Sequence, residues 1–218
     1  MLHAHLTTLH VVSQILKIFA GQPGLTESLL AGSGIAAADL ACSDTRITRT
    51  QELQVCANAL QRRNDLGLEL GRHMHVSAYG LVGYAALSSA TFGDAWRLLL
   101  QYPALLGTYF KLDMHLEGGL AWVSASDYQY APALEVFNLE MCLASLKLMS
   151  DDLLGQPLPL SAAQFSYAEP DYSTRYPHSF ACPLQFNATR NAFAFPASWL
   201  QQPLPLADAV THREVLDR

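Results

Sequence analysis

Apolar residues recur at three- and four-residue intervals through most of the first half of the chain. In residues 7–19 this spacing stacks apolar side chains on one helical face: Leu9, Val12, Ile15, Leu16 and Phe19. Similar spacing, together with Gly stops and Asn/Thr capping signals, predicts helices over residues 27–31, 48–62, 66–73, 80–89 and 91–106. The amino-terminal half is therefore expected to be mostly helical.

The hydrophobic period changes from helical to alternating at Thr108. One face of the next segment carries Tyr109, Lys111, Asp113 and His115, and the other carries Phe110, Leu112, Met114 and Leu116. The turn Glu117-Gly118-Gly119 leads into a second alternating run over residues 120–126. This pattern predicts an antiparallel β-hairpin. A long helical pattern over residues 132–154, opened by Pro132, is expected to cover its apolar face.

The last part of the chain repeats the strand pattern. Strands are predicted at residues 163–167, 184–186 and 192–195, with a short helix near residues 171–176 and a bend at residues 187–191 that suits another hairpin. We expect an α+β fold, with a helical N-terminal half packed with an antiparallel β-sheet built from hairpins in the C-terminal half.

Composition bounds the class of protein. A chain of 218 residues, half of them hydrophobic, can close a core as one large domain. Its net charge of -6 repels nucleic acid, so we do not expect this chain to bind DNA directly. The cysteines lie far apart without a CxxC pair, and the N-terminus lacks a signal-peptide pattern. These features predict a reduced cytoplasmic protein that does not span a membrane.

Enzyme chemistry finds no support in the motifs. There is no GxSxG elbow, no nucleotide-binding glycine loop and no cysteine beside a motif-placed base. The eight histidines lack the spacing of metal ligands. For Asp151-Asp152, a solvated helix end is favoured over a functional site. We expect no catalytic residue, no metal and no cofactor, although an enzyme acting on a small apolar substrate stays the third alternative.

A binding pocket is the better-supported possibility, because aromatic residues concentrate where the helices and the hairpin are expected to meet. Arg72, His75 and Lys111 are polar candidates that could orient a ligand. The alternative is that the aromatic residues simply fill the core. The candidate ligand-binding set is Tyr79, Tyr84, Arg72, Tyr102, Trp122, Phe137 and Met141.

Two dense signatures carry a family resemblance. The first comprises residues 66–71 (LGLELG) and 79–85 (YGLVGYA), and the second comprises residues 172–176 (YSTRY), 180–186 (FACPLQF) and 191–195 (NAFAF). Together they resemble the N-terminal effector domain of bacterial AraC/XylS-type transcription regulators, in the arabinose-binding-like branch.

The resemblance implies a domain that senses a small effector or mediates self-association, ahead of a C-terminal pair of helix-turn-helix motifs. Residues 1–206 would form the effector-sensing and dimerisation domain, and residues 207–218 a linker toward a DNA-binding domain absent from this chain. The implied partners are a small, partly apolar effector, a second copy in a homodimer, and DNA only through that missing domain. A constitutive dimerisation module without ligand is the alternative.

Overall fold

The computed structural model describes residues 6–21, 24–42, 44–102 and 106–216. By its internal contacts the chain divides into two compact units, Met1–Leu66 and Gly67–Arg218. The helix that contains residues 66–71 of the first signature, α4 (Leu66–Gly71), begins at the boundary between them.

The first unit combines helices with a small sheet. Its elements are β1 (Leu6–Thr8), α1 (His10–Ile18), α2 (Leu25–Leu30), a 3-10 helix (Ala37–Ala41), β2 (Arg46–Thr48) and α3 (Arg49–Leu60). Strands β1 and β2 pair antiparallel, which the helical pattern of residues 7–19 did not predict. Thr48 begins α3 with a reciprocal cap, since its hydroxyl accepts the Gln51 N–H at 3.2 Å and Gln51 accepts the Thr48 N–H at 3.0 Å.

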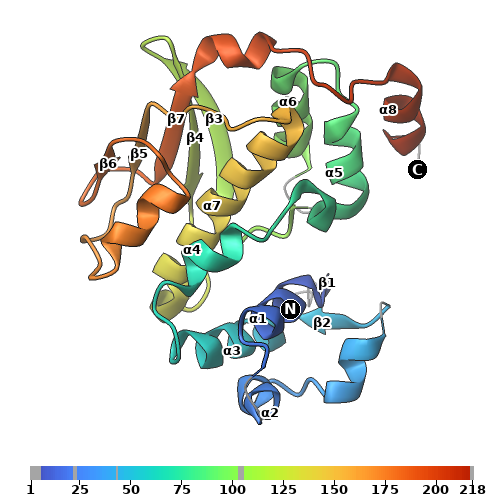
Figure 1. Cartoon of the computed structure of the whole chain (residues 1–218), viewed down its shortest axis with the longest axis vertical. Helices are drawn as coiled ribbons and strands as arrows, with labels where there is room; N and C mark the ends of the chain where they lie inside the picture. Colours follow the sequence, from blue (N-terminus) through green and yellow to red (C-terminus); the bar gives the residue numbers. More distant parts are fainter. Residues whose placement is uncertain (1–5, 22–23, 43, 103–105, 217–218) are drawn as a thin grey trace. The chain divides into compact units, whose positions relative to one another are not determined.

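The second unit contains the larger sheet and the remaining helices. Its helices are α5 (Gly80–Leu87), α6 (Phe92–Gln101), α7 (Glu135–Leu154) and α8 (Ala209–Leu216), with α7 crossing the sheet (Figure 1). Its strands are β3 (Lys111–Glu117), β4 (Leu120–Ser126), β5 (Ala162–Gln164), β6 (Leu184–Gln185) and β7 (Ala192–Pro196). They form one sheet in the order β3-β4-β7-β5-β6.

The two faces of this sheet differ because successive side chains on a strand point in opposite directions. On one face, Val123 is fully buried, and the ring of Phe193 meets Trp96 of α6 edge-on with centroids 6.5 Å apart. The other face carries Asp113, His115 and Trp122, which the β3–β4 register places together. The α+β prediction and the first hairpin are confirmed.

The predicted hairpin across residues 187–191 is wrong. Strand β5 lies between β7 and β6, pairing antiparallel with β7 and parallel with β6. Asn187 adopts a positive φ of 54°, and its N–H donates to the Tyr167 carbonyl at 2.9 Å, so the bend follows the chain beyond β5. The intervening strand comes from a distant segment, which a local hydrophobic pattern does not reveal.

The segment expected to be a linker contains a helix. The Asp208 carboxylate accepts the Thr211 N–H at 2.6 Å and so caps the start of α8. In the same unit, the His212 ring nitrogen Nδ1 lies 2.9 Å from the Ala85 carbonyl oxygen, and α8 packs beside α5 (Figure 1). Residues 209–216 are thus helical and packed against α5.

Candidate functional site

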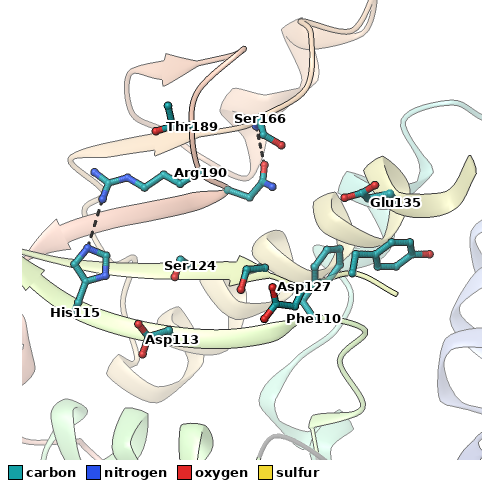
Figure 2. Close-up of a pocket in the computed structure, with 13 residues that line it drawn as sticks. Phe110, Asp113, His115, Ser124, Asp127, Glu135, Ser166, Thr189 and Arg190 are labelled. Atoms are coloured by element: carbon teal, nitrogen blue, oxygen red, sulfur yellow. Dashed lines mark hydrogen bonds between the residues drawn. The ribbon is translucent and has the colours of Figure 1, made fainter. Parts of the chain in front are cut away.

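A pocket of about 460 Å³ opens on the polar face of the larger sheet. It draws side chains from β3, β4, the start of α7 and the loop before β7 (Figure 2). Its lining residues are Phe110, Asp113, His115, Ser124, Ala125, Ser126, Asp127, Tyr128, Glu135, Ser166, Thr189, Arg190 and Asn191. The alternation of β3 and β4 aims the side chains of Asp113, His115, Ser124 and Ser126 at one surface.

Arg190 fixes one end of the pocket. Its guanidinium carbon lies 3.7 Å from the centroid of the Trp122 ring, a cation–π contact that covers the indole. Its Nε donates to Gln164 Oε1 at 2.7 Å, and its Nη1 donates to Glu117 Oε2 at 3.1 Å. His115 Nε2 lies 3.4 Å from the same Nη1. These contacts hold a positive charge in place at the pocket wall.

Two stacked aromatic rings form part of the opposite end. The Phe110 and Tyr128 rings lie 5.0 Å apart at an interplanar angle of 30°. The Tyr128 hydroxyl donates to the Ala131 carbonyl at 3.1 Å and accepts from Asn138 Nδ2 at 2.9 Å. Because Asn138 is fully buried in α7, the tyrosine ring is anchored to the helix.

Three carboxylates line the pocket. Asp127 and Glu135 lie near the Phe110 end, away from Arg190, and Asp113 projects from β3 (Figure 2). Glu135 is the first residue of α7, where the helix dipole favours a negative charge. Asp127 has a φ of 57°, a left-handed conformation that Asp and Asn tolerate better than most residues. The pocket therefore presents an anionic end with aromatic walls and a cationic end.

The first signature packs helices together. A Cβ atom on Gly67 would lie 2.5 Å from the Phe137 carbonyl oxygen and 2.7 Å from Glu140 Oε2. On Gly71 it would lie 2.6 Å from the Ala144 Cβ. Both glycines therefore let α4 approach α7 at backbone distance.

The second signature meets the same helix. Glu140 is fully buried, and its Oε1 accepts hydrogen bonds from the hydroxyls of Tyr172, at 2.9 Å, and Tyr176. The Tyr167 and Tyr176 hydroxyl oxygens lie 2.7 Å apart. Burial and the negative charge of Glu140 raise the pKa of Tyr176, which keeps its hydroxyl protonated as a donor. The YSTRY motif thus supplies partners for a buried carboxylate.

The sequence-based ligand candidates are not among the residues that line the described pocket. Trp122 is nearest, since it lies beneath the lining residue Arg190. Phe137 and Met141 are buried on α7, whereas Tyr84 and Tyr102 are 53% and 41% exposed. The remaining two candidates have other surroundings: Arg72 has its Nη1 3.9 Å from Glu69 Oε2, and burial raises the pKa of Tyr79.

The acidic pair at the end of α7 also differs from its expected solvated state. Asp151 accepts from Lys147 Nζ at 2.6 Å and from the Leu158 N–H at 2.7 Å. Asp152 accepts the Val76 N–H at 2.9 Å and lies 3.0 Å from His75 Nδ1. Both carboxylates connect neighbouring segments to α7, because each accepts a hydrogen bond from a backbone N–H group of such a segment.

Sequence reasoning missed most of the pocket. It placed Asp113 and His115 on one face of a strand, which was the available signal. Asp127 and Glu135 flank the connection from β4 to α7, and Arg190 joins them only because β7 pairs beside β4 in the strand order of the sheet. That order was not predicted, and so the three side chains were not connected.

The described residues were compared with the requirements of a metal site and of a membrane-spanning helix. Within them, no three His, Cys, Asp or Glu side chains gather in a way that could hold a metal ion. No helix among the same residues has both the length and the apolar character needed to cross a membrane.

The comparisons with known proteins decide the family. Residues 25–204 match a family described as the arabinose-binding domain of AraC transcription regulator, N-term. The chain belongs to this family. The resemblance carried by the two signatures is confirmed, and an AraC-type N-terminal domain has a regulatory role.

Curated relatives agree with this assignment. The chain is 34% identical over 160 residues to the ornithine utilization regulator of Pseudomonas aeruginosa, covering 73% of this chain and 47% of that protein. It is 24% identical over 163 residues to the HTH-type transcriptional regulator VqsM of the same organism, covering 69% and 47%. The chain spans about half the length of these relatives. They and the family are transcription regulators and not enzymes.

A solved structure supports the fold. The crystal structure of transcriptional regulator CdpR from Pseudomonas aeruginosa aligns with a TM-score of 0.60 and 22% sequence identity. The alignment covers 73% of this chain and 54% of that chain. At this identity the likeness concerns the arrangement of helices and strands alone.

Proposed function

We propose that this domain senses a small effector for an AraC-type transcription regulator and controls dimerisation or DNA binding of the full-length protein. Residues 1–206 carry the sensing function, and residues 207–218 lead toward a DNA-binding domain that the longer protein supplies. The regulator acts in the cytoplasm, without catalysis by this domain. Membership of the AraC N-terminal family and a pocket with fixed charges support this proposal.

The effector is a small amino acid with a second amino group. The observation that carries this choice is the separation of charge across the pocket, with Arg190 at one end and Asp127 and Glu135 toward the other (Figure 2). Arg190 suits a carboxylate through Nη2, since its Nε and Nη1 already bond to Gln164 and Glu117, and a charge-assisted hydrogen bond is stronger than a neutral one. The carboxylates and the Phe110 ring suit an ammonium group. The carbon chain between the two ends meets the expectation of a partly apolar effector.

Ornithine is the first molecule to test. A relative with 34% identity is named for ornithine utilization, and ornithine carries one carboxylate and two amines on a short chain. Transmission requires the effector to bind one arrangement of the regulator better than another, since a ligand shifts an equilibrium only by its difference in affinity. Asp127 and Glu135 flank the junction between β4 and α7, so a ligand bridging to Arg190 links that junction to the loop before β7.

Isothermal titration calorimetry tests the effector class. The chain is titrated with L-ornithine, with putrescine, which lacks the carboxylate, and with norvaline, which lacks the side-chain amine. We expect ornithine to bind more tightly than both. The double variant D127N/E135Q should weaken ornithine binding at least about tenfold, because a charged hydrogen bond is worth about 1.5–3 kcal/mol.

Asp171→Asn is the matched control. It removes a carboxylate from an exposed position of the same unit that does not line the pocket, and it should leave affinity unchanged. Equal affinity for ornithine in the double variant and the unsubstituted chain would reject this site. Absence of binding by all three probes would reject the proposed effector class.

A further inference from the structure

Strand β3 forms one edge of the five-stranded sheet. It pairs with β4 along its whole length, from Lys111 opposite Ser126 to Glu117 opposite Leu120. On its other side, no strand among the described residues pairs with it. Leu116 on this edge is 66% exposed. An edge of seven residues that carries an exposed leucine is a template for pairing with another strand.

The ladder determines which backbone groups of β3 face outward. The Ala125 N–H donates to the Asn191 carbonyl, and the Ala197 N–H donates to the Gly119 carbonyl, both at 2.9 Å. The odd-numbered residues of β4 therefore point their backbone groups toward β7, and the even-numbered ones toward β3. By the β3–β4 register, the residues of β3 whose N–H and C=O groups point out of the sheet are Leu112, Met114 and Leu116.

We propose that β3 pairs antiparallel with β3 of a second copy of this chain, about a two-fold axis at Met114. This surface deepens the proposed function by naming the homodimer interface of the sensing domain. In this register Met114 faces its own counterpart, and their outward N–H and C=O groups bond to each other. The two sheets then become one continuous sheet across the dimer.

Charge complementarity selects this register. On the polar face, Lys111 lies opposite the second copy's Glu117, and Asp113 lies opposite its His115. On the other face, Leu112 lies opposite Leu116, which covers the exposed leucine. A Lys–Glu ion pair, an Asp–His hydrogen bond and apolar pairs across strands stabilise a sheet.

Neighbouring registers lose this match. A slip by two residues in one direction places Asp113 opposite a second Asp113, and a slip in the other direction places it opposite Glu117. A slip by one residue brings polar side chains onto the apolar face. The sequence KLDMHLE therefore complements itself in one antiparallel register.

Disulfide trapping tests the register. Met114→Cys and Leu116→Cys are each made with Cys42→Ser, which removes the exposed native thiol. Paired Met114 positions would have Cα atoms about 5.5 Å apart, within disulfide reach. The two Leu116 positions would lie about 14 Å apart along the strands. We expect Met114→Cys to form a covalent dimer and Leu116→Cys, the more exposed position, to stay monomeric.

Sedimentation equilibrium of the unsubstituted chain is the second measurement. We expect a reversible dimer that Lys111→Glu weakens roughly tenfold, since two glutamates would then face each other at both ends of the pairing. A monomer at every concentration, or crosslinking at Leu116→Cys in preference to Met114→Cys, overturns the proposal. A monomer that still binds ornithine rejects only this interface, and a dimer that binds no ornithine rejects only the effector site.

Discussion

Cys42 and Cys142 carry the same thiol in opposite surroundings. Cys42 is exposed, and hydrogen bonds from the Asp44 backbone and the Thr45 side chain lower its pKa. Cys142 is buried on α7, and burial raises its pKa to about 11. Because the thiolate is the reactive form, the two residues should differ in rate and in pH dependence.

Alkylation by iodoacetamide, followed by peptide mass spectrometry, measures this difference. Cys42 should react first. Its alkylation rate should rise at a lower pH than that of an ordinary free thiol, because a lowered pKa increases the thiolate fraction at a given pH. Cys142 should be modified slowly at neutral pH, where about one molecule in ten thousand is ionised. Equal rates at the two positions in folded protein would contradict the assigned surroundings, and Cys42→Ser should remove the fast phase.

Among the elements, the close approach of α4 to α7 depends on small residues. Gly67 and Gly71 face the backbone of α7 with no room for a methyl group. The sequence signature that identifies the family is therefore explained here by packing, and the effector contacts are proposed elsewhere. Residues matched by a family need not touch its ligand.

Gly67→Ala tests this packing. Its Cβ would press on the Phe137 carbonyl and on the Glu140 side chain, so we expect about 3 kcal/mol lower free energy of unfolding. Gly118→Ala is the control, because it has a φ of 60° with open space around it and should cost about 1 kcal/mol from backbone strain alone. Urea denaturation followed by circular dichroism compares them. A loss at Gly67 no greater than that at Gly118 would refute the packing argument.

The helices and strands differ in how far the sequence pattern predicts them. Helical and alternating periods predicted α3, α6, α7 and the β3–β4 hairpin, because each depends on neighbours along the chain. The position of β5 between β7 and β6 depends on which distant strands pair, and local periodicity carries no such information. The pocket was not predicted for the same reason, since Arg190 precedes β7 and reaches the β3–β4 face because β7 pairs with β4.

Across the second unit, the pocket and the edge strand share residues. Asp113 and His115 line the pocket, and they also lie in the proposed pairing of β3 with a second copy. An effector that contacts these side chains would alter the charges presented to the partner strand. The two proposals together give a physical link between effector binding and dimerisation, in which coupling requires different affinities for monomer and dimer.

A ¹⁵N NMR titration with L-ornithine shows whether the effector binds on the polar sheet face. We expect saturable shift changes at the backbone amides of Asp127, Thr189 and Asn191, which belong to the pocket wall. Shifts confined to the region of Tyr79, Tyr84 and Met141, with the pocket amides unmoved, would contradict it and favour the site expected from sequence.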